Sequence, residues 1–377
     1  MTRRQAWLYT FALFLAHKFI VVCGSLVFVR RFVSIPEGVG FLQFALLDNF
    51  VRWDSLWYVR IAREGYNYEQ PAAFFPLYPY LIRLLHDGAG LSYNAAGLFI
   101  SNAAFLFALY LLVRLLAKDY SARVVFTTGL LLIGFPTSFY FSAAYTESLF
   151  LLWTVGCFYT LRQGKWVWAG AFGFLASLTR NTGILLALPY IYEYLAARKF
   201  QWREIRSDLL WISLIPLGIA SYMLLLWGRI GDPLGFVHAQ KHWGRSFMWP
   251  WQTLWQGTLD VFDRPRTGWP RVNRKIEMFA VYWELILLLV SLWKERLRMR
   301  RSYLLYAGAA AIVPLLSPSV QHSYFYSIPR FVIVIFPLFV IWGLLLEKKR
   351  WWIPVMVLSM AGQWYLLCKF TRGLFVF

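Results

Sequence analysis

The chain has 377 residues, of which 59% are hydrophobic and 15% charged, so the bilayer rather than water is its expected solvent. Its formal net charge of +20 does not indicate a nucleic-acid-binding protein, because the basic residues stand at the ends of apolar runs instead of along a solvated face. The three cysteines, Cys23, Cys157 and Cys368, lie inside apolar segments and form neither a disulfide framework nor a zinc pattern.

Apolar stretches long enough to be membrane spans recur along the whole chain. The predicted spans are 6–29, 95–117, 124–141, 143–161, 165–179, 182–197, 208–228, 278–293, 302–317, 329–346 and 351–370. We therefore expect one all-α, polytopic membrane domain over residues 1–377, with about eleven transmembrane helices.

Two N-terminal segments need a separate interpretation. The first apolar run ends at Arg30-Arg31 without a small-residue cleavage site, which predicts an uncleaved span rather than a signal peptide. Residues 73–90 are apolar but contain Pro76, Pro79, Arg83 and His86. We expect them to form a helix at the membrane interface instead of a span.

The basic turns predict how the chain is oriented. With a cytoplasmic N-terminus, one side collects the turns 118–123, 162–165, 198–206, 294–301 and 347–350. Two external loops, 30–94 and 229–277, then lie on the opposite side. The second loop is itself basic, although the positive-inside rule does not expect basic residues on this side. An anionic substrate is one explanation for its charges.

The first external loop contains the densest group of polar and aromatic residues, Asp48 followed by Arg52-Trp53-Asp54-Ser55. In an active site, Asp54 could be a general base for an acceptor hydroxyl, Arg52 could hold a phosphate and Trp53 could stack on a sugar. An Asp–Arg pair that orders an interfacial loop explains the same residues equally well.

The order of these residues resembles the signature region of the PIG-V (GPI mannosyltransferase II) family. The resemblance rests on Arg52-Trp53-Asp54-Ser55, Ile61-Ala62, Gly65-Tyr66, Tyr68-Glu69, Phe74-Phe75-Pro76, Phe135-Pro136, the run from Ser142 to Phe150 and Arg180-Asn181-Thr182-Gly183. Beyond residue 200 it is looser, although Trp243-Gly244-Arg245 and Pro329-Arg330-Phe331 are similar to bacterial relatives.

The resemblance implies a GT-C fold and a glycosyltransferase that takes a sugar, mannose in this family, from a polyprenyl- or dolichyl-phosphate donor. It further implies transfer with inversion on the non-cytoplasmic face, with Asp54 in the first external loop as the catalytic base. Asp48 is the fallback, and a contact to the loop or the substrate is its more plausible role.

The remaining predicted contacts are to substrate. Glu147 precedes an apolar run, where the helix dipole favours an acidic residue with or without a substrate. Arg180-Asn181 interrupts a long apolar stretch and suits a lipid phosphate. Arg180, Arg245 and Arg330 are candidates to stabilise the leaving phosphate. The predicted set also includes Ser55, Glu69, Lys241 and Trp243.

No cofactor is predicted with certainty. His238 and His242 are four residues apart, but no HExxH motif or nearby carboxylate completes a zinc site. There is no DxD motif either, and dependence on a divalent metal is left open. The expected partners are a lipid-linked sugar and membrane lipid, without nucleic acid.

The acceptor and the compartment depend on the origin of the chain. In a bacterial plasma membrane, which the N-terminal stretch favours, the acceptor could be a glycolipid, a wall polymer or a protein. In an endoplasmic reticulum membrane it would be a GPI precursor. A transporter or lipid flippase is the alternative function, but the chain shows no internal repeat and its polar residues gather at one face. An inactive GT-C-like scaffold fits the intact Arg-Trp-Asp motif less well.

Overall fold

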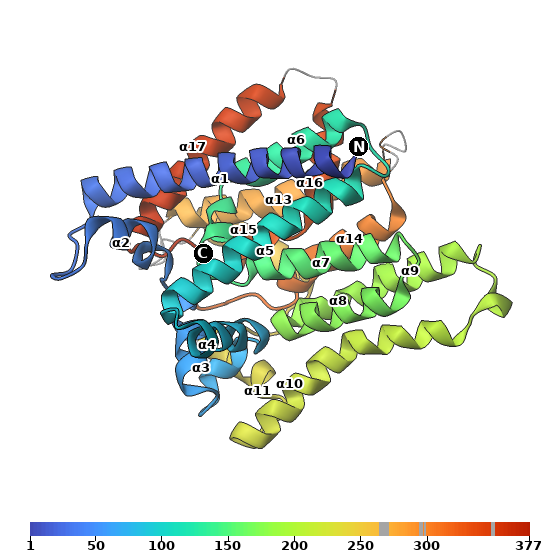
Figure 1. Ribbon diagram of the computed structural model, residues 1–377, viewed down its shortest axis with the longest axis horizontal. Coiled ribbons are helices and arrows are strands. Elements are labelled where there is room, and N and C mark those ends of the chain that lie inside the picture. The colour runs from blue at the N-terminus through green and yellow to red at the C-terminus, as the bar shows by residue number, and fades with distance from the viewer. Residues whose placement is uncertain (264–270, 294–296, 298, 348–350) are drawn as a thin grey trace.

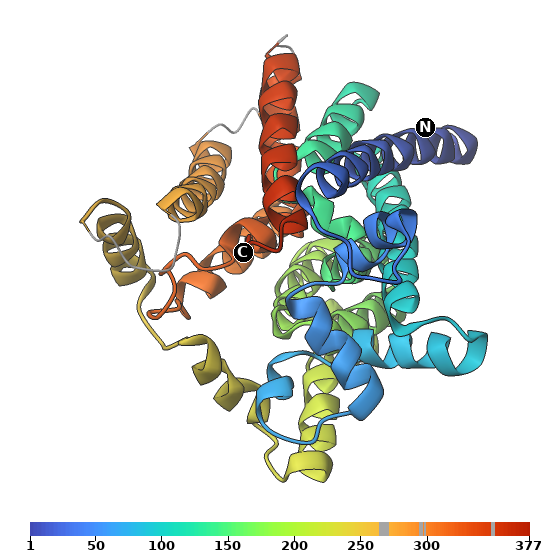
Figure 2. The same ribbon diagram turned by 90° about the vertical axis from the view of Figure 1, so that its left-hand side faces the viewer.

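The computed structural model describes residues 1–263, 271–293, 297, 299–347 and 351–377. Apart from isolated bridges at Ser319, the regular elements in these ranges are helices (Figures 1 and 2). The α-helices are α1 (Arg3–Phe32), α2 (Phe41–Leu46), α3 (Asp54–Glu64), α4 (Leu77–Ala89), α5 (Tyr93–Leu116), α6 (Ala122–Gly134), α7 (Glu147–Leu161), α8 (Trp166–Thr179), α9 (Ala187–Ala197), α10 (Leu214–Ile230), α11 (Gly235–His238), α12 (Pro250–Asp263), α13 (Arg271–Trp293), α14 (Arg301–Leu315), α15 (Ile328–Val332), α16 (Phe336–Leu346) and α17 (Trp352–Thr371). The 3-10 helices are η1 (Asp48–Phe50), η2 (Gln70–Ala73), η3 (Ser138–Ser142), η4 (Asn181–Leu186), η5 (Trp202–Glu204), η6 (Ser207–Ser213) and η7 (Ala239–Trp243).

Five helices of the described ranges are long and apolar enough to cross a membrane: α1, α5, η6 with α10, α13 and α17. The apolar helices α6, α7, α8 and α16 are shorter. Every predicted span contains a helix, so the all-α prediction is confirmed. The number of spans stays a prediction.

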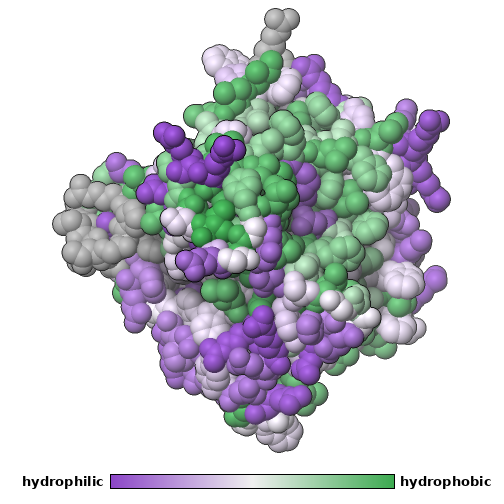
Figure 3. Space-filling view, turned by 60° about the vertical axis from the view of Figure 1, so that its left-hand side comes forward, coloured by the Kyte–Doolittle hydropathy of each residue, from purple (hydrophilic) through white to green (hydrophobic). Residues whose placement is uncertain are grey.

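Large apolar side chains on the outside of the bundle agree with a lipid environment. On α13, for example, Phe279, Ile286, Leu289 and Leu292 are each more than half exposed. An exposed apolar surface of this kind does not persist in water. Figure 3 shows hydrophobic side chains over the upper part of one face, with hydrophilic side chains gathered below them.

Three of the predicted spans are broken rather than continuous. The segment 124–141 breaks after α6, where Phe135 is extended and Pro136 follows, because proline disfavours a helical residue before it. The segment 182–197 begins as the 3-10 helix η4, as the segment 208–228 does with η6, although the latter continues directly into α10 as one long helix. The segment 329–346 is divided into α15 and α16, and α15 starts after Ser327, whose φ is 67°.

At these breaks, backbone carbonyl groups lose their partners within the helix, and neighbouring side chains contact them instead. His17 contacts the carbonyl of Ser138 at 3.0 Å, and the Thr137 hydroxyl donates to the carbonyl of Pro329 at 2.7 Å. Such partners are required because lipid offers none. Broken helices are therefore stable here, and their ends supply polar residues inside the bundle.

The predicted loop 229–277 overlaps a helix. Helix α13 begins at Arg271, so Arg274 of the predicted loop lies on the helix that continues into the predicted span 278–293. Arg274 is buried and forms an ion pair with Asp260 at 3.5 Å. The ion pair joins α13 to α12. It explains the charge of Arg274 without an anionic substrate. The predicted loop also contains Arg264 and Arg266, which lie outside the described residues.

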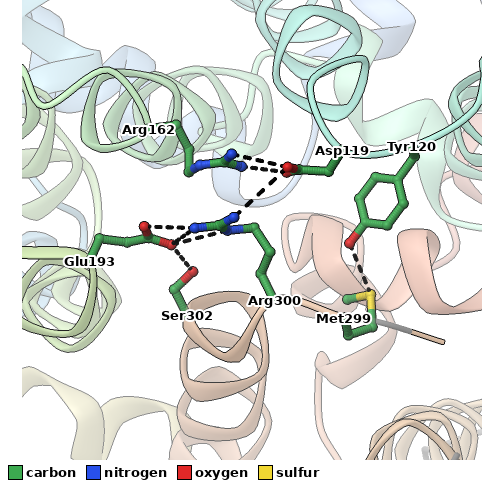
Figure 4. A network of polar contacts seen from close by, with 7 residues as sticks. All are labelled: Asp119, Tyr120, Arg162, Glu193, Met299, Arg300 and Ser302. Atoms are coloured by element: carbon green, nitrogen blue, oxygen red, sulfur yellow. Dashed lines mark hydrogen bonds and ion pairs between the residues drawn. The ribbon is translucent and has the colours of Figure 1, made fainter. Parts of the chain in front are cut away.

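One end of the bundle is joined by a charged network (Figure 4). Arg162 donates to Asp119, Arg300 lies 3.8 Å from Asp119 and 2.9 Å from Glu193, and Ser302 donates to Glu193 at 2.5 Å. These contacts connect the turns after α5 and α7 with α9 and the start of α14. Three of the five basic turns predicted on a common side thus meet at one end.

The opposite end carries α2, α3, α4 and α11, beside the C-terminal residues (Figure 1). Helix α4, within the predicted interfacial segment 73–90, packs against α3 and α5. The α11–η7 segment packs on η2. The two predicted external loops are therefore neighbours in space.

Candidate active site

The backbone at Trp53 sets the direction of Asp54. Trp53 has φ 57° and ψ −116°, a strained combination for a residue with a side chain. Helix α3 begins directly after it, at Asp54. Two contacts hold this turn: Tyr145 donates to the carbonyl of Arg52 at 3.0 Å, and Trp53 packs edge to face on Phe375 with ring centroids 5.1 Å apart.

Asp54 faces an arginine from the other half of the chain. Its carboxylate accepts a hydrogen bond from Arg330 of α15 at 2.5 Å. Arg330 also lies 3.2 Å from Glu147, which in turn lies 3.4 Å from Arg180. Glu147 is 1% exposed and is the first residue of α7, where the helix dipole stabilises a carboxylate.

Three guanidinium groups and one carboxylate face the site: Arg180, Arg245 and Arg330 with Asp54. Two more buried carboxylates lie close by, Glu147 beside Arg330 and Glu277 near Arg245. Arg245 donates to the carbonyl of Ser317 at 2.6 Å. Burial lowers the pKa of Arg245 to about 10, so this arginine stays protonated at neutral pH. A buried cationic cluster of this kind favours an anionic group such as a phosphate.

These residues line one end of a cavity of ≈ 230 Å³. Its charged end contains Asp54, Arg180, Asn181, Arg245 and Arg330, with Gln240, Trp243, Tyr326 and Phe375 beside them. Its other wall is one face of α14, formed by Tyr306, Ala310, Val313 and Pro314. The cavity thus combines the guanidinium groups of Arg180, Arg245 and Arg330 with an apolar wall along α14.

Several predicted site residues do not line this cavity. Trp53 lines a second cavity that also contains Asp54. The guanidinium of Arg52 lies 5.7 Å from the Phe44 ring, and Ser55 is buried behind the turn. Asp48 accepts hydrogen bonds from Asn94 at 3.1 Å and Gln43 at 3.4 Å, so it orders the loop.

Glu69 and Lys241 connect the two external segments near the cavity. Lys241 lies 2.9 Å and His242 3.3 Å from the Glu69 carboxylate. The hydrogen bond from Lys241 lowers the pKa of Glu69 below the usual glutamate value. The next residue, Trp243, packs edge to face on Phe74 with centroids 5.5 Å apart. The ion pair itself does not line the cavity. It positions the neighbouring residue Trp243, which does.

Sequence reasoning missed the wall formed by α14 and the aromatic residues Tyr326 and Phe375. The ring of Tyr326 stacks on Phe375 with centroids 5.7 Å apart. Nothing in the motif points to these residues. The short side chains of the Ala307–Ala311 run were the one available signal, because small residues on an apolar helix leave room for a neighbour.

The described residues do not form an evident metal site. No three His, Cys, Asp or Glu side chains come together within the part of the chain that the structure describes. The carboxylate of Asp54, which lines the cavity, and that of Glu147, which does not, both contact Arg330. A divalent ion between them would have to displace this guanidinium.

Comparisons with solved structures identify the fold. ArnT from Cupriavidus metallidurans, crystallised with undecaprenyl phosphate, superposes with a TM-score of 0.55 at 16% identity, over 93% of this chain and 62% of that chain. ArnT is a GT-C membrane glycosyltransferase. The predicted GT-C fold is confirmed.

Sequence comparisons identify the family. The GPI mannosyltransferase 2 of Yarrowia lipolytica is 28% identical over 187 residues, 49% of this chain and 52% of that protein. The human GPI alpha-1,6-mannosyltransferase 2 is 31% identical over 162 residues, 40% of this chain and 33% of that protein. The chain thus spans about half the length of the first relative and a third of the second. Residues 8–209 match the family described as Mannosyltransferase (PIG-V). Because this match covers more than half of the residues and includes Asp54, Glu147 and Arg180, the chain belongs to the PIG-V mannosyltransferase family.

Proposed function

We propose that the protein transfers a mannose residue from a polyprenyl-phosphate carrier to a hydroxyl group of an extracytoplasmic acceptor, with inversion at the anomeric carbon. The observation that carries this proposal is the position of Asp54 beside the Arg330 guanidinium, in a cavity that Arg180, Arg245 and apolar residues of α14 also line. A carboxylate beside an anion-binding cluster suits a reaction that needs a base and a stabilised phosphate leaving group.

The reaction is a single displacement. The acceptor oxygen attacks the anomeric carbon, and the bond from that carbon to the phosphate oxygen breaks with its electron pair. The acceptor proton passes to Asp54, and lipid phosphate is the second product. Arg180, Arg245 and Arg330 stabilise the charge that develops on the phosphate.

Glu147 acts as a positioning residue in this scheme. Its carboxylate lies 3.2 Å from Arg330 and 3.4 Å from Arg180. Arg330 can exchange Asp54 for the donor phosphate while Glu147 still holds its guanidinium. This exchange frees the Asp54 carboxylate to accept a proton only when the donor is bound.

The apolar groove along α14 suits the first isoprene units of the carrier. Tyr306, Ala310, Val313 and Pro314 present an apolar wall, and apolar walls with a few convergent polar groups are typical of such ligand sites. The ArnT structure contains undecaprenyl phosphate, and a carrier of the same chemical class in the present cavity supports the proposal by analogy of fold.

We further propose that the end with α2, α3, α4 and α11 faces away from the cytoplasm, in a bacterial plasma membrane. The charged network of Asp119, Arg162 and Arg300 lies at the other end, where the positive-inside rule expects basic turns. Impermeant maleimides applied to intact cells would label a cysteine introduced at exposed Tyr68 and spare one introduced at exposed Arg123. The reverse labelling pattern would contradict this orientation.

The function is tested with purified protein in liposomes, radiolabelled polyprenyl-phosphate-mannose and a membrane lipid extract. We expect label to move into a new product with the wild type and with Asp48→Asn, because an asparagine at position 48 can still accept from Asn94. Asp54→Asn should lower the rate at least about 10²-fold while the protein stays folded. Equal activity of Asp54→Asn and Asp48→Asn would exclude Asp54 as the base. Substrate uptake into sealed vesicles without transfer would favour the transporter alternative.

A further inference from the structure

A buried glutamate of α13 contacts the turn from which α15 begins. Glu277 is fully buried, and its carboxylate accepts a hydrogen bond from the backbone N–H of Ser327 at 3.3 Å. We infer that Glu277 is a positioning residue: it fixes the turn before α15 and thereby holds Arg330 against Asp54. This inference rests on the proposed function, because the residue acts on the transfer reaction only through Arg330.

The backbone of Ser327 is strained and is bonded directly to that of Arg330. Ser327 has φ 67°, in the left-handed region that residues with a side chain adopt at a cost. Its carbonyl accepts hydrogen bonds from the backbone N–H groups of Arg330 at 3.0 Å and Phe331 at 3.2 Å, while its own N–H donates to Glu277. The conformation of this one residue therefore sets the position of the Arg330 backbone.

Both residues of the Asp54–Arg330 ion pair follow a left-handed turn. Trp53, with φ 57°, directly precedes Asp54, and Ser327 stands three residues before Arg330. Neither is a glycine, so each turn needs contacts that hold it. The first turn is held by a tyrosine hydroxyl and a phenylalanine ring, and the second by the Glu277 carboxylate.

A carboxylate at this position of α13 is costly unless it has a role. Glu277 lies within an apolar helix that is long enough to cross a membrane, where buried ionisable residues are rare and usually functional. It lines neither of the two cavities, but α13 packs on α15. Its charge also lies near Arg245. The hydrogen bond and the charge are separable, because an amide at this position keeps an acceptor oxygen and loses the charge.

The test measures backbone hydrogen exchange and transfer in variants of position 277. Glu277→Ala should speed the exchange of amides between residues 325 and 335. It should also lower kcat about tenfold or more, because a misplacement of about 1 Å at a reacting site can cost about 10²-fold. Glu277→Gln keeps an acceptor for the Ser327 N–H and should restore most of both losses.

Glu284 provides the matched control. It lies seven residues further along the same face of α13 and is 1% exposed. Glu284→Ala removes a buried carboxyl group from the same helix, so it reports the general effect of such a loss. It should leave the exchange between residues 325 and 335 unchanged and lower kcat by less than about twofold.

A glycine at position 327 tests the route of the effect. Glycine adopts a positive φ readily, so Ser327→Gly should relieve the strain that Glu277 offsets. In this background Glu277→Ala should lower kcat by less than about threefold, whereas in the Ser327→Ala background, where the Cβ remains, it should have its full effect. If Glu277→Ala alone does not fold, the yield of folded protein should show the same difference between the two backgrounds.

The possible results separate the two proposals. Equal exchange and equal kcat in Glu277→Ala and Glu284→Ala would overturn the positioning role. So would a Glu277→Gln variant as impaired as Glu277→Ala, because the effect would then belong to the charge near Arg245, and so would equal losses in the glycine and alanine backgrounds. Hydrogen exchange does not depend on transfer. If the wild type transfers no mannose while Glu277→Ala still speeds exchange at α15, the positioning role stands and the proposed function fails.

Discussion

Arg330 donates a hydrogen bond of 2.5 Å to Asp54 across 276 positions of the chain. The contact joins α3, inside the segment matched to the PIG-V family, to α15, outside it. The C-terminal part of the chain thus supplies Arg245 and Arg330 to a site whose carboxylates come from the N-terminal part. A fragment that ends near residue 209 would contain the motif without this cationic cluster.

Removing the Arg330 charge should destabilise the protein. In Arg330→Gln, the buried Glu147 loses one of its two cationic partners and Asp54 loses its ion pair. Breaking a buried pair typically costs about 3–5 kcal/mol, and we expect a loss of this order in denaturation in detergent. Adding Glu147→Gln should recover part of the loss. Arg83→Gln breaks an exposed pair with Asp87 and should change stability by less than about 1 kcal/mol. A similar small effect of Arg330→Gln would contradict the buried pairing.

A larger side chain in the α14 wall of the first cavity should weaken donor binding more than it slows the chemical step. Ala310→Phe places a ring in the cavity wall of α14, where it competes with the carrier chain. We expect a KM for polyprenyl-phosphate-mannose raised about tenfold, with less change for donors of very short chain. The control is Leu305→Phe on the same helix, at a side chain that is 44% exposed. If both variants behave alike, the groove does not hold the carrier.

The turn at Arg180 should not tolerate a side chain at Gly183. A Cβ there would lie 2.4 Å from backbone atoms of Ala176 and Ser177, so the turn must move away from α8. Overpacking of this kind costs about 1–3 kcal/mol, and displacement of Arg180 should also lower the transfer rate. At Gly308 of α14 a Cβ meets nothing within 4 Å, so Gly308→Ala should be neutral or up to about 1 kcal/mol stabilising. Thermal unfolding and initial rates of the two variants provide the comparison.

The contact between Glu69 and Lys241 should be insensitive to pH near neutrality. Because Lys241 lowers the pKa of Glu69 in the folded protein, the contact stabilises the fold above the unfolded glutamate pKa. This stabilisation is lost as the pH falls from the unfolded glutamate pKa through the lower, folded pKa. Glu69→Gln should speed tryptic cleavage after Lys241 at neutral pH, whereas Asp87→Asn should not. Equal cleavage rates would show that the ion pair does not hold the α11–η7 segment.

Much of the fold was predictable, because each span is an apolar run with basic turns at its ends. The break at Arg180 was also predicted from the sequence, whereas the predicted span 124–141 ran through the break at Pro136. The start of α13 was not, because Arg274 is charged yet buried by its pairing with Asp260. A charge in the sequence does not reveal whether it will have a partner in the fold.

The candidate site was predictable where a motif carried it and unpredictable where long-range geometry did. Asp54 lines both cavities, whereas neighbouring Arg52 packs beside Phe44, since the left-handed φ of Trp53 reverses the chain between them. Strain at a tryptophan has no sequence signature. Its cause is tertiary: Tyr145 and Phe375 hold the turn.

The three guanidinium groups that line the first cavity have a consequence for turnover. A sugar-linked carrier is a phosphodiester with one negative charge, whereas the released carrier is a monoester with a charge of about −1.5 to −2 at pH 7. Arg180, Arg245 and Arg330 should therefore retain the spent carrier more tightly than the fresh one. If the proposed function holds, we expect the departure of the lipid rather than the chemical step to limit the rate, and free polyprenyl phosphate to compete strongly with the donor.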